Sequence, residues 1–218
     1  MRLSDKYRPR RLAEVVGQAG ARVLARFCRQ PYRSCWLLEG PPGTGKSATA
    51  HAVAEEMGCT TLSKHVIPAN KLNVELAEAL FGRYTRFIPM DGAPFHVVVV
   101  EEFERVVSPE VKGYLKTALD WSVHPDDGLP LRCIVVATSN NVEKIEEALL
   151  ERFNVLQFSG GPSLAGAAQE RLAEIWAEEC PGEDMPPGWQ RWGWIGDRFS
   201  MRSALREMEQ HLLMECAA

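Results

Sequence analysis

The sequence has no long apolar segment. Its longest wholly apolar stretches, such as residues 97–100 and 133–137, fall far short of the roughly 20 residues needed to cross a bilayer. No apolar segment follows the charged N-terminus, where a secretory signal would carry one. We therefore expect a soluble, cytoplasmic protein that makes no contact with a membrane.

The sequence also lacks closely spaced cysteine pairs and a large excess of positive or negative charge. The 6 cysteines form no C-x-x-C pair, so neither a zinc site nor a disulfide framework is predicted. The 25 basic and 29 acidic residues give a net charge of −4, unlike a protein that coats nucleic acid. Residues 1–35 differ, because they hold nine basic side chains against Asp5 and Glu14. That segment fits either an edge that faces a polyanion or a solvated charged surface.

What is present is typical of a globular α/β protein. The 218 residues are 45% hydrophobic and 25% charged, which excludes a disordered or low-complexity chain. Short β-rich runs alternate with helical patterns, as in β-α units around a parallel sheet. The expected strands are residues 34–38, 62–67, 95–100, 131–137 and 155–158. The predicted fold class is therefore α/β, with a three-layer parallel sheet.

Helix signals and a break in the pattern divide the chain. Helices are expected at residues 46–57, closed by Gly58, and at 109–121, where Ser108 caps the first turn. After residue 158, Ser159-Gly160-Gly161-Pro162 interrupts the alternation and no further strand-like run follows. We predict an α/β domain over residues 1–160 and a small helical domain over residues 161–218, with helices near 164–180 and 200–214. The tryptophans of this second part, Trp176, Trp189, Trp192 and Trp194, are expected to pack in its core, although a base-stacking platform would also fit.

One glycine-rich motif carries chemistry. The pattern G-x-x-x-x-G-K-[ST] is matched by Gly40-Pro41-Pro42-Gly43-Thr44-Gly45-Lys46-Ser47, between a predicted strand and a predicted helix. Such a P-loop turns its backbone N–H groups toward phosphates, while the lysine adds positive charge and the serine offers a hydroxyl to Mg²⁺. A plain turn would need neither Lys46 nor Ser47. The motif predicts a nucleoside triphosphate site, with Lys46 among its catalytic residues.

A valine run that ends in two acids forms the second candidate. Residues 97–100 precede Glu101 and Glu102. Ligands of parallel sheets gather at the carboxyl ends of the strands, where these acids would lie. We expect Glu101 to face the metal ion and Glu102 the attacking water. The alternative is that both acids simply end a strand in solvent.

Together these motifs resemble those of the AAA+ ATPases. The N-terminal segment further resembles the clamp-loader (replication factor C) small subunits, with their K-Y-R-P-x-x-L…V-V-G-Q opening. The matching residues are Asp5-Lys6-Tyr7-Arg8-Pro9-Arg10-Arg11-Leu12 and Val15-Val16-Gly17-Gln18. The resemblance implies ATP and Mg²⁺ as cofactors and a helical lid at the C-terminus. It also implies that the residues near the nucleotide include Tyr7, Arg8, Pro9, Val15 and Val16.

Three polar residues are similar to catalytic positions of this family. Asn140 is similar to sensor 1, whose amide positions the lytic water, although a turn-forming asparagine would also fit. Arg152 is similar to the arginine finger that reaches a neighbouring subunit's γ-phosphate, although an arginine at a helix end also favours the dipole. Arg202 is similar to sensor 2 of the lid, with Arg198 as its competitor and a plain surface arginine as the alternative.

The resemblance also implies partners. These are a homo- or hetero-oligomer of AAA+ subunits, primer–template DNA bound without sequence preference, and a sliding clamp. The residues that match the DNA-tracking helices, each of which could instead be solvated surface charge, are Lys71, Arg83, Arg86 and Lys112. We therefore expect an oligomeric, DNA-stimulated ATPase whose hydrolysis releases DNA or a protein partner.

Two departures from the family pattern leave an alternative open. Glu101 stands where the family has aspartate, and the extra methylene moves the carboxylate outward by about 1.5 Å. Turnover should suffer more from this change than binding. The sequence also ends at Ala218, without the helical collar that follows the lid in such subunits. The alternative is a nucleotide-binding switch or scaffold subunit that hydrolyses little ATP and donates Arg152 to a partner.

Overall fold

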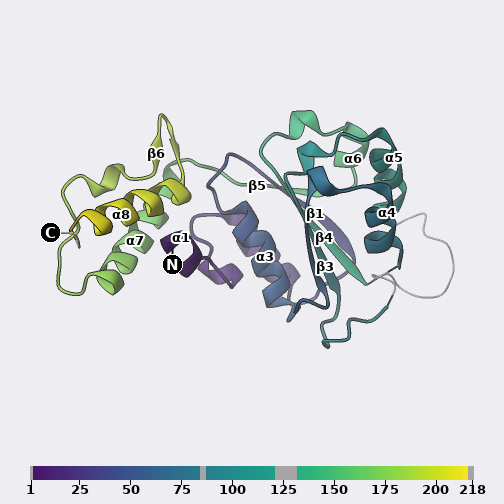
Figure 1. The fold of residues 1–218 in the computed structure, drawn as a ribbon, viewed down its shortest axis with the longest axis horizontal. Coiled ribbons are helices and arrows are strands. Elements are labelled where there is room, and N and C mark those ends of the chain that lie inside the picture. Colours follow the sequence, from purple (N-terminus) through teal and green to yellow (C-terminus); the bar gives the residue numbers. More distant parts are fainter. Residues whose placement is uncertain (1, 84–86, 121–131, 216–218) are drawn as a thin grey trace.

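The structure is a computed structural model that describes residues 2–83, 87–120 and 132–215. A parallel sheet with helices on both faces lies beside a mainly helical C-terminal part (Figure 1). Arg86, Trp121 and Leu131, which the sequence predictions include, lie outside the described residues.

The sheet contains the five strands that the sequence predicts. They are β1 (Ser34–Glu39), β2 (Lys64–Pro68), β3 (His96–Glu101), β4 (Cys133–Ser139) and β5 (Asn154–Gln157). All neighbours pair in parallel, in the order β2-β3-β4-β1-β5. The chain therefore crosses from β1 to β2 at one edge of the sheet and then builds back through β3 to β4, which lies between β3 and β1. This order brings the carboxyl ends of β1, β4 and β3 side by side, where ligands of open α/β sheets bind.

The valine run confirms burial on both faces of the sheet. Val97 and Val99 pack with α2 (Ala19–Phe27) and α3 (Lys46–Glu56) on one face. Val98 and Val100 pack on the other face, which is covered by α4 (Val74–Ala77), α5 (Pro109–Ala118) and α6 (Glu147–Leu150). Because both faces of the strand are covered by helices, all four consecutive positions are apolar, and apolar and polar residues do not alternate along it.

Helix ends follow their expected signals. Gly58 follows α3 with φ +72°, and the Ser108 hydroxyl accepts a hydrogen bond from the Val111 N–H at 3.2 Å at the start of α5. Short 3₁₀ and π helices complete the framework: η1 (Leu12–Glu14), η2 (Ala69–Lys71), η3 (Glu78–Arg83), η5 (Phe103–Arg105), η6 (Val142–Lys144) and η7 (Trp189–Arg191).

The C-terminal part contains α7 (Pro162–Glu179) and α8 (Met201–Glu215). The prediction that no strand follows residue 158 was wrong, because β6 (Trp194–Ile195) and β7 (Arg198–Phe199) pair as an antiparallel hairpin. Strands of two residues are too short to show alternation in the sequence. The hairpin is held by the cross-strand pair Trp194–Phe199, with ring centroids 5.8 Å apart. Trp176 is buried near Trp192, so these two tryptophans pack in a core as expected, whereas Trp194 is exposed.

The N-terminal helix α1 (Leu3–Lys6) packs against the C-terminal helices rather than the sheet. Leu3 is buried in the same apolar cluster as α7 and α8, and its N–H donates to Glu209 Oε1 at 3.2 Å. The Tyr7 hydroxyl donates to Glu179 Oε1 at 2.6 Å. Figure 1 shows α1 between the C-terminal helices and α3. The N-terminal helix and the C-terminal helices therefore pack together as one unit.

Nowhere in the described ranges is a helix long and apolar enough to cross a membrane.

Candidate functional site

The P-loop runs from the end of β1 to the first turn of α3. Gly43 and Gly45 have φ values of +84° and +95°, which side chains with a Cβ rarely adopt. Gly40 also has a positive φ, +150°, and a Cβ there would in addition lie 2.0 Å from the Phe158 carbonyl oxygen. Gly45 precedes α3 directly, so the free N–H groups of that helix face the same region as the loop.

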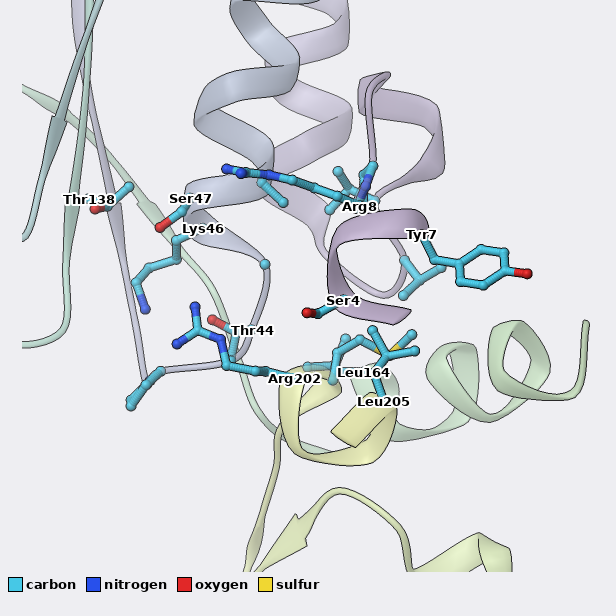
Figure 2. A pocket seen from close by; sticks show the side chains of 18 of the residues that line it. Ser4, Tyr7, Arg8, Thr44, Lys46, Ser47, Thr138, Leu164, Arg202 and Leu205 are labelled. Atoms are coloured by element: carbon cyan, nitrogen blue, oxygen red, sulfur yellow. The ribbon is translucent and has the colours of Figure 1, made fainter. Parts of the chain in front are cut away.

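A cavity of about 430 Å³ opens above this loop. Its walls come from the P-loop, the segment around α1, the carboxyl ends of β3 and β4, and the C-terminal helices. Figure 2 shows Arg202 reaching from α8 toward Thr44 and Lys46, with Ser4 and Arg8 on the opposite wall. The predicted residues that line it are Tyr7, Arg8, Pro9, Val15, Val16, Pro42, Gly43, Thr44, Gly45, Lys46, Ser47, Glu101, Glu102, Asn140 and Arg202.

Lys46 is buried at the base of the cavity. Its ammonium donates to the carbonyl oxygens of Gly40 at 2.6 Å and Pro41 at 2.7 Å. These two predicted residues do not line the cavity, but their carbonyls hold the lysine. Burial lowers the pKa of Lys46 to about 8, with Glu104 opposing the shift and Arg202 contributing to it. A buried cation held by neutral carbonyls, with an arginine close by, fits an anionic ligand such as a triphosphate.

The acidic side of the cavity supplies oxygen ligands. Ser47, Glu101, Glu102 and Thr138 line it, and hydroxyl and carboxylate oxygens are the donors that Mg²⁺ prefers. Within the described residues, no group of three or more His, Cys, Asp or Glu side chains forms a closed metal cage. A magnesium ion that takes most of its ligands from phosphates and water fits such an open set. Ser47 and Glu101 would hold it.

Glu101 has a neighbour that the sequence did not predict. His51 lies one turn after Ser47 on α3, and its Nε2 is 3.7 Å from Glu101 Oε1. Burial lowers the pKa of His51 to about 4, and Arg8 and Lys64 add to the shift. The imidazole is therefore neutral at pH 7, so it does not neutralise the Glu101 carboxylate that a metal ion would bind.

Glu102 is held in an unusual backbone conformation. With φ at +57°, it is the one non-glycine residue with positive φ among those described. Such a conformation costs free energy and is found mainly at functional sites. The Glu102 N–H donates to the Thr138 hydroxyl at 3.2 Å, and its carboxylate pairs with Arg105 at 2.9 Å. Thr138 thus anchors the turn that holds Glu102 at the edge of the cavity.

Asn140 follows β4 and lies on the cavity wall. Its neighbour Asn141 makes the turn, because the Asn141 Oδ1 accepts from the Glu143 N–H at 2.9 Å. Asn140 instead donates from both its backbone N and its Nδ2 to Glu104 Oε1, at 3.2 and 3.3 Å. Of the two asparagines, Asn140 is therefore the one free of a turn-forming task.

Sequence reasoning missed several residues of the site. Thr138, Glu104 and His51 each lie beside a predicted residue, and the run of acids at 101, 102 and 104 was the available signal for Glu104. Arg171 lines the cavity from the middle of α7, and its guanidinium lies over the Tyr7 ring at 5.7 Å. Nothing in the sequence marks Arg171, because only the packing of α7 against α1 brings it there.

Arg152 lies away from the cavity of its own chain. Its Nε donates to the Lys116 carbonyl oxygen at 2.6 Å, and its Nη2 is 3.4 Å from Asp120 Oδ2. A further bond joins it to the Ala148 carbonyl oxygen. Arg198 does not line the cavity, so of the two arginines proposed for the lid position only Arg202 does.

Of the residues predicted to contact DNA, Lys71 and Lys112 do not line the cavity. Lys71 ends η2 and is exposed, and Arg83 ends η3. Lys112 on α5 pairs with Glu146 at 3.1 Å. Arg86 falls outside the described residues.

Similar proteins carry the same architecture. A mutant RuvB from Thermotoga maritima superposes with a TM-score of 0.71 over 98% of this chain and 68% of that one, at 19% identity. The FIGL-1 AAA domain bound to ADP gives a TM-score of 0.58 over 83% of this chain and 64% of that one, at 21% identity. At such identities these likenesses establish the fold alone.

Sequence relatives are more specific. A replication factor C small subunit from Archaeoglobus fulgidus is 28% identical over 179 residues, or 80% of this chain and 53% of that protein. The sliding-clamp-loader large subunit of Escherichia phage RB69 is 24% identical over 194 residues, or 84% and 55%. This chain thus spans about half the length of these relatives. The model of the ATPase family associated with various cellular activities (AAA) matches residues 36–160. That match covers more than half of the sequence, and the chain belongs to the AAA family.

Proposed function

We propose that this chain is an oligomeric, DNA-stimulated ATPase of the clamp-loader type, which binds ATP and Mg²⁺ where subunits meet. One observation carries the proposal: a single cavity brings Lys46 of the P-loop together with Glu102, Asn140 and Arg202. These residues come from four separate elements, so their convergence is a property of the fold and not of one motif. The similarity to proteins named replication factor C small subunit supports the clamp-loader class.

Nucleotide binding would use the chain's own charges. The Lys46 ammonium would leave the Gly40 and Pro41 carbonyls for the outer phosphates, and Arg202 would approach the same phosphates from α8. Apolar side chains on the opposite wall, including Val15, Val16 and Leu164, suit the base. Mg²⁺, held by Ser47 and Glu101, would supply positive charge that offsets the negative charge of the triphosphate.

Hydrolysis requires a base and a fixed water. Glu102 would orient the attacking water after its carboxylate turns from Arg105 toward the cavity. Asn140 would hold the same water from the neighbouring strand. Charge builds on the γ-phosphoryl oxygens only as the bond breaks, so positive side chains placed there lower the barrier.

Arg152 would complete the site of a neighbouring subunit. It does not line the cavity of its own chain, and it lies at the end of α6 with its guanidinium partly exposed. Loss of such a finger in P-loop proteins costs roughly 10³ to 10⁵ in rate, about 4 to 7 kcal/mol. A single subunit should therefore hydrolyse ATP slowly, and activity should rise with assembly.

We also propose that residues 1–160 and 161–218 act as a nucleotide-binding domain and a lid. The cavity has walls from both parts, so a bound nucleotide would bias their relative position. DNA would be contacted by Lys71, Arg83, Arg86 and Lys112, with Lys112 first released from Glu146. A sliding clamp is the proposed protein partner.

The alternative function is a nucleotide-binding switch or scaffold subunit. Two observations favour it: glutamate replaces aspartate at position 101, and the Glu102 carboxylate is paired with Arg105. Steady-state ATPase measured with and without primed DNA, at several protein concentrations, separates the two. Turnover that rises with concentration and DNA, and that Glu102→Gln abolishes while ATP still binds, supports the enzyme. Tight ATP binding with no turnover under any of these conditions supports the switch.

A further inference from the structure

Glu104 is a third carboxylate close to the cavity, and the proposed function gives it no role. It lies in η5, directly after the strand that ends in Glu101, and beside the carboxyl end of β4. It does not line the cavity. Both hydrogen bonds that it accepts from Asn140 end on the same oxygen, Oε1.

These two bonds fix the side chain of Asn140. An ionised carboxylate can only accept, so the amide must turn its Nδ2 toward Glu104. The Asn140 Oδ1 therefore lies on the side of the amide away from Glu104, on a residue that is exposed at the cavity wall. An oxygen acceptor suits a water molecule, which can donate. It does not suit a phosphate oxygen, which is itself an acceptor.

The second oxygen of Glu104 argues against a purely structural role. In the part of the chain that the structure describes, Oε2 is buried and has no hydrogen-bond partner. An unpaired buried carboxylate oxygen costs free energy, and a neutral amide could make the contact to Asn140 at a lower cost. Glu104 is also the charge that most strongly favours the protonated form of Lys46, so it lies close to the phosphate site.

We propose that Glu104 is a positioning residue for hydrolysis, which holds the Asn140 amide so that Oδ1 accepts a hydrogen bond from the attacking water. The proposal rests on the proposed function, because it assigns a task within the same reaction. It predicts that removing Glu104 slows the chemical step and leaves nucleotide binding almost unchanged.

A double-mutant cycle on the full chain tests this. The variants are Glu104→Ala, Asn140→Ala and their combination, with Glu110→Gln as control, since Glu110 is an exposed carboxylate that accepts from the Ser108 hydroxyl. Glu104→Ala should lower kcat by about 10- to 100-fold, the worth of a hydrogen bond to a charged group, and change the Kd for ATP by less than about threefold. The double variant should be no slower than Asn140→Ala. The proposal would be overturned if the decreases in kcat of the two single variants add up in the double variant, or if Glu104→Ala raises the Kd for ATP by as large a factor as it lowers kcat.

A second measurement does not depend on turnover. In the nucleotide-free protein, the side-chain amide resonances of Asn140 in a ¹⁵N–¹H spectrum should shift in Glu104→Gln and should not shift in Glu110→Gln. Unchanged Asn140 resonances would overturn the proposal even in an active enzyme. If the resonances shift but the wild-type chain hydrolyses no ATP, the proposed function fails and the positioning role fails with it. If the wild-type chain hydrolyses ATP but the decreases in kcat of the two single variants are additive, the positioning role fails and the proposed function stands.

Discussion

The approach of α8 to the P-loop makes Gly43 an informative position. A Cβ at Gly43 would lie 2.0 Å from Ser200 Oγ and 2.9 Å from Ser200 Cβ. Ser200 is buried, and its hydroxyl accepts from the Ser203 N–H at 3.3 Å at the start of α8. The Met201 N–H also donates to the Gly43 carbonyl oxygen at 3.0 Å. Ser200 therefore cannot turn aside without disturbing the helix start.

Gly43→Ala should lower the free energy of unfolding by about 2 to 4 kcal/mol. Placing alanine at φ +84° contributes about 1 kcal/mol. Displacing Ser200 and its cap contributes about 1 to 3 kcal/mol. Gly58→Ala is the matched control, because Gly58 has φ +72° but no atom within 4 Å of the added Cβ. The control should cost about 1 kcal/mol, from the backbone alone.

Urea unfolding of the two variants, with titration of a fluorescent ATP analogue, provides the assay. Gly43→Ala should lose more stability than Gly58→Ala and bind the nucleotide more weakly, because the substitution changes both the loop and the α8 contact. If the two variants lose equal stability and both bind like the wild type, then α8 does not lie against the P-loop and the cavity described above is wrong.

Three further predictions concern the same site. Lys46→Ala should abolish ATP binding in a fluorescence titration and leave the thermal midpoint almost unchanged, whereas normal binding would refute the placement of the phosphates. ATP affinity should fall about tenfold between pH 7 and pH 9, because free Lys46, with a pKa of about 8, loses its proton and binding requires the charged form. A flat affinity profile would contradict this. Arg152→Ala subunits mixed with Glu102→Gln subunits should regain ATPase activity; a mixture as inactive as its parents argues against action in trans.

Much of the fold could be predicted because its signals are local. The buried valines at residues 97–100, the capping serine at 108 and the glycine at 58 each carry their signal within a few neighbours. The hairpin of Trp194 and Phe199 could not, because two-residue strands leave no periodic pattern.

The site divides in the same way. Lys46 and Ser47 could be assigned from one contiguous motif, and Glu101 and Glu102 from the strand before them. The resemblance to the clamp-loader subunits predicts Tyr7, Asn140, Arg152 and Arg202, and the structure brings all but Arg152 to the cavity.

The sequence alone determined that a parallel sheet carries a P-loop at the end of its first strand, because the P-loop motif and the apolar runs of the buried strands are each made of consecutive residues. Tertiary structure decided which distant groups share the cavity. Only packing places Arg171 over Tyr7, brings Arg202 rather than Arg198 to the cavity above the P-loop, and joins Glu104 to Asn140. These contacts depend on strand order and on how α1, α7 and α8 meet, which no stretch of neighbouring residues specifies.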